Sequence, residues 1–273
     1  MSFLRPPARC NAAPGVSGLR ILLVNVFFLS AREGSRDWVL VDAGLRGSGP
    51  AILREAERLF GRGVPPRAIV LTHGHFDHTG ALPWLLRRWR TPVFAHPREL
   101  PFCNHGERYA PADPTVGGGI VPWLATLFPR TPTQIPFEVR LLPADGSVPG
   151  LPEWQWIHTP GHSPGHISLW RESDACLVAG DAVVSTRQES LFSVWRQSPE
   201  LRPPPAYFTP DWPRAFDSMR TLRKLSPAVI ASGHGQTLAG PVWLRHWDEL
   251  IGHFGTRGLP RQGRYVPAQW ATA

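Results

Sequence analysis

Residues 73–78 of the chain read His73-Gly74-His75-Phe76-Asp77-His78, and they follow the apolar run 68–72, which predicts a strand. Three imidazoles and one carboxylate therefore stand within six positions. With 11 histidines in 273 residues, the chance of such a match is on the order of 10⁻³. Imidazole and carboxylate ligands without a thiolate suit zinc, iron or manganese. The stretch predicts a metal site at the end of a strand.

Three further polar residues stand in glycine-flanked positions at the ends of other expected strands. His162 lies in a turn between two strands, Asp181 follows Gly180, and His234 lies between two glycines. Loops at strand ends are where a rigid scaffold presents reactive side chains, and glycine allows the backbone to approach closely. We therefore expect these residues to join the cluster at 73–78.

Apolar runs alternate with amphipathic stretches along the rest of the chain. Strands are expected at residues 21–29, 38–41, 68–72, 92–95, 138–142, 154–157, 166–170, 175–179 and 229–231, and helices at 50–60, 82–89, 211–225 and 242–254. Two segments, at about 97–136 and 185–210, are expected to be loop excursions over the site. This pattern predicts one α/β domain over residues 1–273.

The composition bears on partners and location. The net charge is +8, but Lys224 is the only lysine among 29 basic residues and no nucleic-acid motif accompanies the arginines, so nucleic acid is not the expected partner. Cys10, Cys103 and Cys176 form no CxxC pair, which argues against a disulfide framework or a cysteine zinc site. A membrane span needs about 20 apolar residues, and the longest run here is residues 21–29. We expect a cytoplasmic protein with a small-molecule substrate, no membrane partner and the capacity to form a homodimer.

In their order along the chain, these motifs resemble those of the metallo-β-lactamase superfamily. The resemblance runs through Val-Asp-Ala-Gly at residues 41–44, the cluster at 73–78, His162, Asp181 and His234. It implies a single α/β domain built as a four-layer αβ/βα sandwich, with a metal site at one edge of the two sheets. It also implies that Asp42 is a buried structural residue near the site and not a ligand.

The resemblance further implies two divalent ions, with Zn²⁺ the first choice and Fe or Mn the alternatives. The implied ligands are His73, His75 and His162 for the first ion, Asp77, His78 and His234 for the second, and Asp181 as a bridge. Two ions about 3.5–4 Å apart can share a hydroxide of lowered pKa, which attacks a carbonyl or phosphoryl centre. Asp77 is also the candidate catalytic residue, because it can orient the nucleophile or carry a proton.

Differences between this sequence and other branches of the superfamily reduce the number of reactions to be expected. The bridging position holds Asp181, unlike the Cys or Ser of true β-lactamases, and the surrounding segments are similar to the lactonase and glyoxalase II branches. Residues 188–190 and 207–210 are similar to those of an uncharacterised bacterial subgroup of hydrolases. Lactonases of the quorum-quenching type place a tyrosine soon after the bridging aspartate. Residues 182–185 of this chain contain no tyrosine, and Tyr207, from the next loop, is the candidate substitute. The leading interpretation is a dinuclear hydrolase of a small ester, lactone or thioester.

Two alternatives stay open at this point. A mononuclear iron dioxygenase of the persulfide type keeps the same cluster but uses only part of it, whereas the presence of both Asp77 and His234 favours two metals. A phosphodiesterase or nuclease is suggested by the net charge of +8. Metal content separates the first alternative from the hydrolase, and the salt dependence of nucleic-acid binding tests the second.

The segment 185–210 also supplies a candidate substrate pocket. Phe192, Trp195, Tyr207 and Phe208 are expected to form an apolar wall for an acyl or ring group, with packing of the loop on the core as the alternative. The remaining histidines have other expected roles. His158 and His166 are expected to hydrogen-bond around the ligands, and core or surface positions are expected for His96, His105, His246 and His253.

Overall fold

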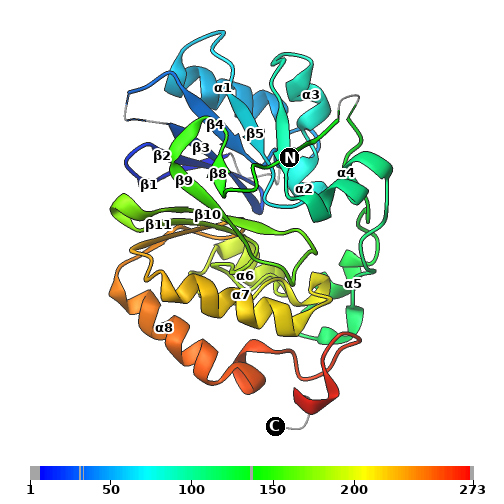
Figure 1. Ribbon diagram of the computed structural model, residues 1–273. Coiled ribbons are helices and arrows are strands. Elements are labelled where there is room, and N and C mark those ends of the chain that lie inside the picture. The colour runs from blue at the N-terminus through cyan, green and yellow to red at the C-terminus, as the bar shows by residue number, and fades with distance from the viewer. Residues whose placement is uncertain (1–6, 31, 33, 136–137, 271–273) are drawn as a thin grey trace.

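Two β-sheets face each other at the centre of the molecule, and helices cover their outer faces (Figure 1). The computed structural model describes residues 7–270 except residues 31, 33 and 136–137. In spatial order the first sheet contains β1 (Ala8–Ala13), β2 (Val16–Ile21), β3 (Val24–Ser30), β4 (Trp38–Val41), β5 (Ala68–Val70), β6 (Val93–Ala95) and β7 (Arg140–Leu141). The second contains β13 (Leu238–Ala239), β12 (Val229–Ser232), β11 (Cys176–Gly180), β10 (Ile167–Arg171), β9 (Leu151–His158) and β8 (Ser147–Val148).

The α-helices differ in length and in role. The three longest, each of three turns or more, pack on the sheets, and the shorter ones lie in connections. In chain order they are α1 (Gly49–Phe60), α2 (Phe76–Thr79), α3 (Leu82–Leu86), α4 (Leu100–His105), α5 (Val121–Ala125), α6 (Leu191–Arg196), α7 (Trp212–Lys224) and α8 (Pro241–Gly252). In Figure 1, α1 and α3 lie on the outer side of the first sheet, and α7 and α8 lie on the outer side of the second.

Three apolar cores separate the layers and confirm the four-layer αβ/βα sandwich. One core fills the space between the first sheet and its helices and includes Trp38 and Ile52. A second lies between the two sheets and includes Trp154. The third joins the second sheet to α7 and α8 through residues such as Met219 and Trp247. Burial of apolar area in these cores supplies the main drive for folding.

The amphipathic periodicity predicts the long helices well. In α1, proline at position 50 occupies the first turn and the buried side chains Ile52, Ala56 and Phe60 recur every four residues. In α7, Asp211 caps the helix, since its carboxylate accepts a hydrogen bond from the Arg214 N–H at 3.1 Å. Both helices confirm the expected ranges to within one or two residues.

The expectation of one strand over residues 21–29 is wrong. The structure ends β2 at Ile21, turns, and begins β3 at Val24, with Leu22 at a φ of +60°. Eight of the nine residues 21–29 are apolar, including Leu22 although it is 42% exposed, and no Gly, Pro or Asp marks the reversal, so the turn is not visible in the sequence. The same reversal places the Leu23 carbonyl beside His234, to which it is hydrogen-bonded at 2.8 Å.

Parallel pairing gathers the polar strand ends at one edge of the sandwich. Strands β4, β5 and β6 run parallel in the first sheet, and β11 and β12 run parallel in the second. The carboxyl ends of parallel strands lie at the same edge of a sheet, where open α/β sheets bind their ligands. The residues that follow β4, β5, β11 and β12 therefore meet there.

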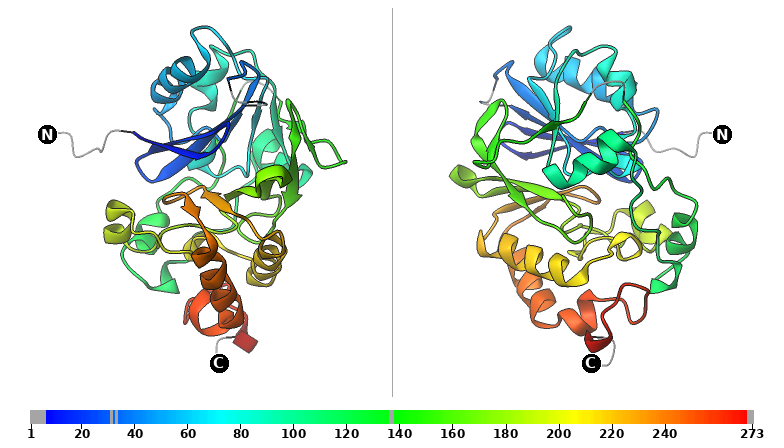
Figure 2. Two further views of the ribbon diagram at one scale, coloured as in Figure 1. Left: turned by 90° about the vertical axis from the view of Figure 1, so that its left-hand side faces the viewer. Right: turned by 45° about the vertical axis from the view of Figure 1, so that its right-hand side comes forward.

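The two expected excursions contain short helices and pack against each other. Segment 97–136, whose residue 136 lies outside the described residues, carries α4 and α5, and segment 185–210 carries α6. Val121 and Ala125 of the first segment share a small core with Tyr207 of the second. Figure 2 shows α5 and α6 on the same side of the sandwich. Residues 1–6 and 271–273 of the expected domain also lie outside the described part.

Replacing Trp38 tests the outer core of the first sheet. Its fully buried ring stacks on Phe60 at 4.5 Å and meets Trp89 edge-on at 5.5 Å. Trp38→Ala is expected to lower the free energy of unfolding by about 3–5 kcal/mol, and Trp38→Phe by clearly less, because a stacking ring remains. Urea unfolding measures both changes, with the exposed Leu141→Ala as a control expected to stay within about 0.5 kcal/mol. Equal losses for the two Trp38 variants would contradict the stacking argument.

Candidate metal centre

Seven buried polar side chains from both sheets converge at this edge. His73 follows β5, and the next three ligand-type residues stand at the start of α2 or within it. The others follow strands of the second sheet or lie in the turn between β9 and β10. The full set is His73, His75, Asp77, His78, His162, Asp181 and His234, and the structure brings all seven together in overlapping groups.

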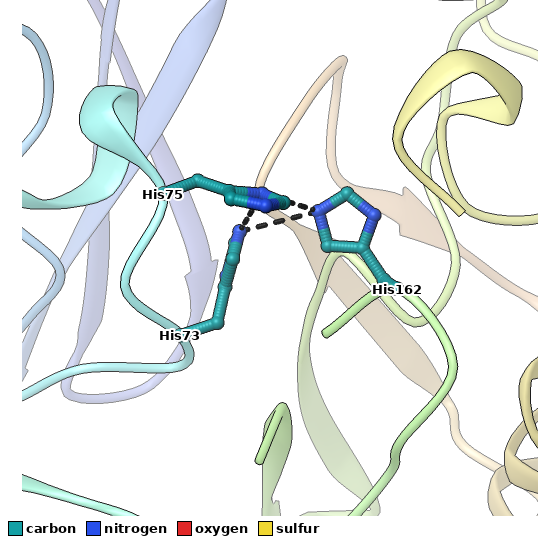
Figure 3. Close-up of side chains that lie close together, drawn as sticks. All are labelled: His73, His75 and His162. Atoms are coloured by element: carbon teal, nitrogen blue, oxygen red, sulfur yellow. Dashed lines mark hydrogen bonds between the residues drawn. The ribbon is translucent and has the colours of Figure 1, made fainter. Parts of the chain in front are cut away.

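Three imidazole nitrogens form the first group (Figure 3). The Nε2 atom of His73 lies 3.0 Å from Nδ1 of His75 and 3.2 Å from Nε2 of His162, and the last two atoms are 2.9 Å apart. A neutral imidazole has only one N–H, so a ring of three facing nitrogens cannot be satisfied by hydrogen bonds among them alone. Ligands about 2.0–2.1 Å from one zinc ion stand at such mutual distances. This group fits a single cation.

The protonation of these histidines favours metal binding. Burial, together with the nearby histidines, lowers the pKa of His75 to about 3 and holds the pKa values of His73 and His162 well below the usual range. Neutral imidazoles keep a free lone pair, which a metal ion requires. The first group is therefore ready to bind a cation at neutral pH.

The second group lies across Asp181 from the first. Oδ2 of Asp77 is 3.5 Å from Nε2 of His234 and 3.9 Å from Nε2 of His78. Oδ2 of Asp181 lies 3.5 Å from the first group at His162, 3.1 Å from His234 and 3.6 Å from His78. One carboxylate oxygen thus faces ligands of both groups, which is the position that a bridging ligand takes.

Unpartnered buried atoms provide a direct test of whether cations fit. Nε2 of His78 and Oδ1 of Asp181 are fully buried and have no hydrogen-bond partner among the described residues. Buried polar atoms without a partner carry a desolvation cost that a metal ion removes. The donor set of imidazole and carboxylate also suits a divalent ion of the zinc, iron or manganese type. The residues fit divalent ions of this kind.

Charge in the second group differs from charge in the first. Burial favours the neutral form of His78, but the carboxylates of Asp42, Asp181 and Asp77 raise its pKa well above the usual value. Burial lowers the pKa of His234 and the carboxylate of Asp181 raises it, and the net result is a raised pKa. Against its own burial, Asp181 has a pKa held well below the ordinary range by these two histidines. In the absence of metal, these shifts favour the protonated forms of the two histidines.

Asp42 holds the first sheet's ligands in place, as a structural residue would. Its carboxylate accepts hydrogen bonds from the backbone and hydroxyl of Thr72 at 2.8 and 2.7 Å, and it is 2.8 Å from Nδ1 of His78. Asp42 has a φ of +62°, a conformation that is costly for a non-glycine residue and is kept here by these bonds. A carboxylate behind a histidine ligand fixes its tautomer and its orientation.

His166 positions Asp181 through a directional chain of hydrogen bonds. Its Nε2 accepts the Asp181 N–H at 2.8 Å, so its Nδ1–H must donate to Thr159 Oγ1 at 2.8 Å. The chain continues from Thr159 to Ser168 and from Ser168 to the Ala179 carbonyl. Burial lowers the pKa of His166 to about 3, so the ring stays neutral. His158 lies farther out, stacked on His96 at 4.0 Å.

Glu99 is a supporting residue that no sequence motif identifies. Its buried carboxylate accepts hydrogen bonds from the Gly74 N–H at 2.9 Å, Ser163 Oγ at 2.7 Å and the Gly165 N–H at 2.8 Å, and also from the Tyr109 hydroxyl. Burial raises the pKa of Glu99, and the four donors oppose that effect. One carboxylate thus ties the loop of His73 and His75 to the loop of His162.

Asn25 is a second residue that the motifs miss. Its side-chain amide donates to the carbonyls of Ser232 and Gly235, both at 2.8 Å, and therefore clamps the loop that carries His234. Asn25 stands in the first sheet and the loop stands in the second, so this contact joins the two sheets at the site. Gly233 is required in the loop, because a Cβ there would lie 2.1 Å from Oδ1 of Asp181.

A cavity of about 230 Å³ opens onto the metal ligands. Its wall is mostly apolar and includes the ligands His75, Asp77, His162, Asp181 and His234, with Leu23, Leu45, Phe76, Val121, Leu124, Phe128, Gln188, Leu191, Val194, Pro205, Tyr207 and Phe208. Of the four expected wall residues, Tyr207 and Phe208 line this cavity. Phe192 and Trp195 do not: neither lines this cavity, and they are 65% and 59% exposed, because α6 turns them away from the ligands.

The Tyr207 hydroxyl is available to a ligand in the cavity. Burial raises the pKa of Tyr207 well above the usual value, and the carboxylates of Glu189, Asp77 and Asp181 act in the same direction. The phenol therefore stays protonated and can donate a hydrogen bond.

A second cavity, of about 460 Å³, shares Gln188 with the first and is lined by Arg187, Arg202 and Arg261 among others.

The chain belongs to the metallo-β-lactamase superfamily. The family model described as metallo-beta-lactamase superfamily matches residues 19–234, which contain all seven ligand-type residues. Membership, the fold and the His/Asp groups together identify a hydrolase of this superfamily with metal-binding residues. In the described part of the chain, no helix is long and apolar enough to cross a membrane.

Relatives with assigned names agree with this class. The chain is 46% identical over 250 residues to a Bacillus subtilis (strain 168) protein named "Probable metallo-hydrolase YflN", covering 92% of this chain and 95% of that one. It is 26% identical over 227 residues to the hydroxyacylglutathione hydrolase of Xanthomonas axonopodis pv. citri (strain 306), covering 81% and 68%. Among solved structures, a protein crystallised in a di-iron-bound form superposes with a TM-score of 0.52 at 23% identity, covering 93% and 98%.

Glu99→Gln tests the tie between the two ligand loops. The amide keeps the shape but replaces one acceptor oxygen by a donor, so some of the four donors lose their partner. We expect the affinity of the first group for zinc to fall about 10–100-fold, as is usual when a residue behind the ligands is changed. Competition with a chelator measures the affinity, and Glu107→Gln on the exposed surface is the control. Unchanged affinity in Glu99→Gln would contradict the role assigned to Glu99.

Proton release distinguishes the two groups during metal uptake. The lowered pKa values of the first group favour neutral imidazoles, whereas the raised pKa values of His78 and His234 favour bound protons that a metal ion displaces. Zinc added stepwise to metal-free protein should therefore release more protons at the second group than at the first. Titration calorimetry in buffers of different ionisation enthalpy counts them, and His234→Ala should lower the release at the second group. Equal release in both steps would contradict the assignment.

Proposed function

We propose that the chain is a dinuclear metal-dependent hydrolase that cleaves a small ester, lactone or thioester in the cytoplasm. The observation that carries the proposal is the position of Asp181, whose Oδ2 faces His162 on one side and His78 and His234 on the other. A single-metal site needs ligands on one side only. Seven ligand-type side chains in overlapping groups support two ions, with Zn²⁺ proposed first and Fe or Mn as alternatives.

The bound ions would polarise the carbonyl of the substrate and lower the pKa of bound water towards about 7. The first ion would be held by His73, His75 and His162, and the second by Asp77, His78 and His234, with Asp181 shared.

The chain's own groups supply the rest of the chemistry. Asp77 lines the cavity and can carry the proton that the leaving group needs. Tyr207 lines the same cavity and can donate a hydrogen bond to the oxyanion that develops. The apolar wall around them excludes water, which strengthens both interactions.

The lining of the cavity supports the proposed substrate class. Its apolar residues suit an acyl or ring group, and a volume of about 230 Å³ suits a small one. The similarity to a hydroxyacylglutathione hydrolase supports a thioester among the candidates. Phosphodiesters and nucleic acids suit this cavity less well, because no arginine or lysine lines it; Arg108 lines only a smaller cavity of about 110 Å³ on the other side of His75 and His162.

A mononuclear iron dioxygenase is the second candidate. The first group of three imidazoles could serve it alone, and the solved protein in a di-iron-bound form keeps iron among the metals to consider. Asp77, His78 and His234 would then have no role as ligands, although the structure gathers them within the same few ångströms. Two metal ions per chain together with hydrolysis would exclude this candidate.

Metal content and a substrate panel test the proposal together. Natively metallated protein should contain two divalent ions per chain and hydrolyse at least one of homoserine lactones, S-lactoylglutathione and simple esters, while a phosphodiester is not cleaved. Asp77→Asn should lower kcat/KM by about 10²–10⁴-fold, because a group that moves a proton is lost.

Asp37→Asn is the matched control for Asp77→Asn, since Asp37 is an exposed carboxylate paired with Arg67 far along the first sheet. It should leave kcat/KM unchanged. One iron per chain, or no turnover of any of the three substrates with both ions bound, would overturn the proposal.

A further inference from the structure

The surface at the mouth of the catalytic cavity is strongly apolar. Ten large hydrophobic side chains are exposed in the described part of the chain, and seven of them lie within residues 120–127 and 191–195. The seven are Ile120, Trp123, Leu124, Leu127, Leu191, Phe192 and Trp195. Leu127 is 81% exposed and Trp123 is 66% exposed. A concentration of exposed apolar side chains marks a binding surface.

The two segments are neighbours, and both continue into the cavity. A Cβ on Gly119 would lie 2.2 Å from the Glu189 carbonyl oxygen, so their backbones touch just before α5 and α6 (Figure 2). Leu124 of α5 and Leu191 of α6 each line the cavity, although they are 38% and 51% exposed at the surface. These two side chains therefore belong to both the interior wall and the outer surface.

Charged side chains are few along this path, and in α6 the Arg196 guanidinium lies over the Phe192 ring. Residues 117–128 contain no charged side chain in a protein of net charge +8. Inside the cavity, the side chains that follow Leu124 and Leu191 towards the ligands are again apolar, and include Phe128, Val194 and Phe208. We call the path from the metal ligands to Trp123 and Leu127 the apolar track.

We propose that the apolar track binds the straight hydrocarbon chain of an acyl substrate whose ester, lactone or thioester group lies at the metal ligands. The inference rests on the proposed function, and it adds that the substrate carries a chain long enough to leave the cavity. Continuity favours this occupant, because Leu124 and Leu191 line the same cavity as the ligand-type residues His75, Asp77 and Asp181. A lipid bilayer would cover the exposed residues but would not enter the cavity. A second copy of the chain would block the entrance of the cavity to substrate.

A homologous series of straight-chain p-nitrophenyl esters from acetate to decanoate tests the proposal. In the wild-type protein, kcat/KM should rise about two- to fourfold for each methylene added beyond butyrate, as expected for partial burial of each group. The double variant Trp123→Ser/Leu127→Ser should lower kcat/KM for decanoate by at least about tenfold and leave acetate unchanged. Both side chains are exposed, so folding should survive, and Leu141→Ser, 55% exposed in β7, is the matched control.

A binding measurement separates this inference from the proposed function. Titration calorimetry, whose signal does not depend on Trp123, should report binding of sodium decanoate, but not of butyrate, to the wild type, and the double variant should lose this binding. Decanoate binding without hydrolysis of any ester, lactone or thioester would remove the proposed function and keep the track as a chain-binding site. A flat chain-length series, or equal losses for acetate and decanoate, would overturn the track. So would vesicle binding or a dimer that the double variant abolishes while the series stays flat.

Discussion

A single buried carboxylate, that of Asp181, is the contact on which both halves of the site depend. It follows β11 in the second sheet but faces histidines contributed by both sheets, at 3.1 to 3.6 Å. A buried carboxylate is stable only beside positive charge, so either metal ions or protons on His78 and His234 must accompany it. The surrounding structure serves this requirement: His166 fixes the Asp181 backbone, and Gly233 leaves room for the oxygen.

This constraint couples the fold to the metal content. The apolar cores hold the sheets together, but at the site edge the sheets meet through polar contacts such as Asn25 with the His234 loop and Glu99 with the His162 loop. These contacts hold the ligand-type side chains close together. When no cation lies between those side chains, like groups repel each other and some of their polar atoms have no hydrogen-bond partner. Metal binding therefore stabilises the junction of the two sheets as well as supplying the chemistry, since a cation that binds only the folded chain shifts the folding equilibrium.

The sequence predicts the parts of the molecule that repeat a local pattern. Periodicity predicts α1 and α7, and the spacing of residues 73–78 is sufficient by itself to indicate the metal centre. Local patterns fail where contacts join distant positions. Glu99 accepts hydrogen bonds from Gly74 and Gly165, which lie 25 and 66 positions away in the sequence. The residues next to Glu99 in the sequence form no motif that would indicate this role. The turn at Leu22 is hidden for another reason: its residues are apolar although Leu22 is 42% exposed, so no polar side chain marks the turn.

The division between sheets and excursions also separates chemistry from substrate choice. The ligands stand at the ends of strands and in a short hairpin turn, where pairing within two sheets fixes them. The cavity wall beyond the ligands comes instead from the excursions, through residues such as Val121, Leu124 and Leu191. Loops accept substitutions that sheets do not. A relative can therefore share every ligand-type residue with this chain and still act on a different substrate.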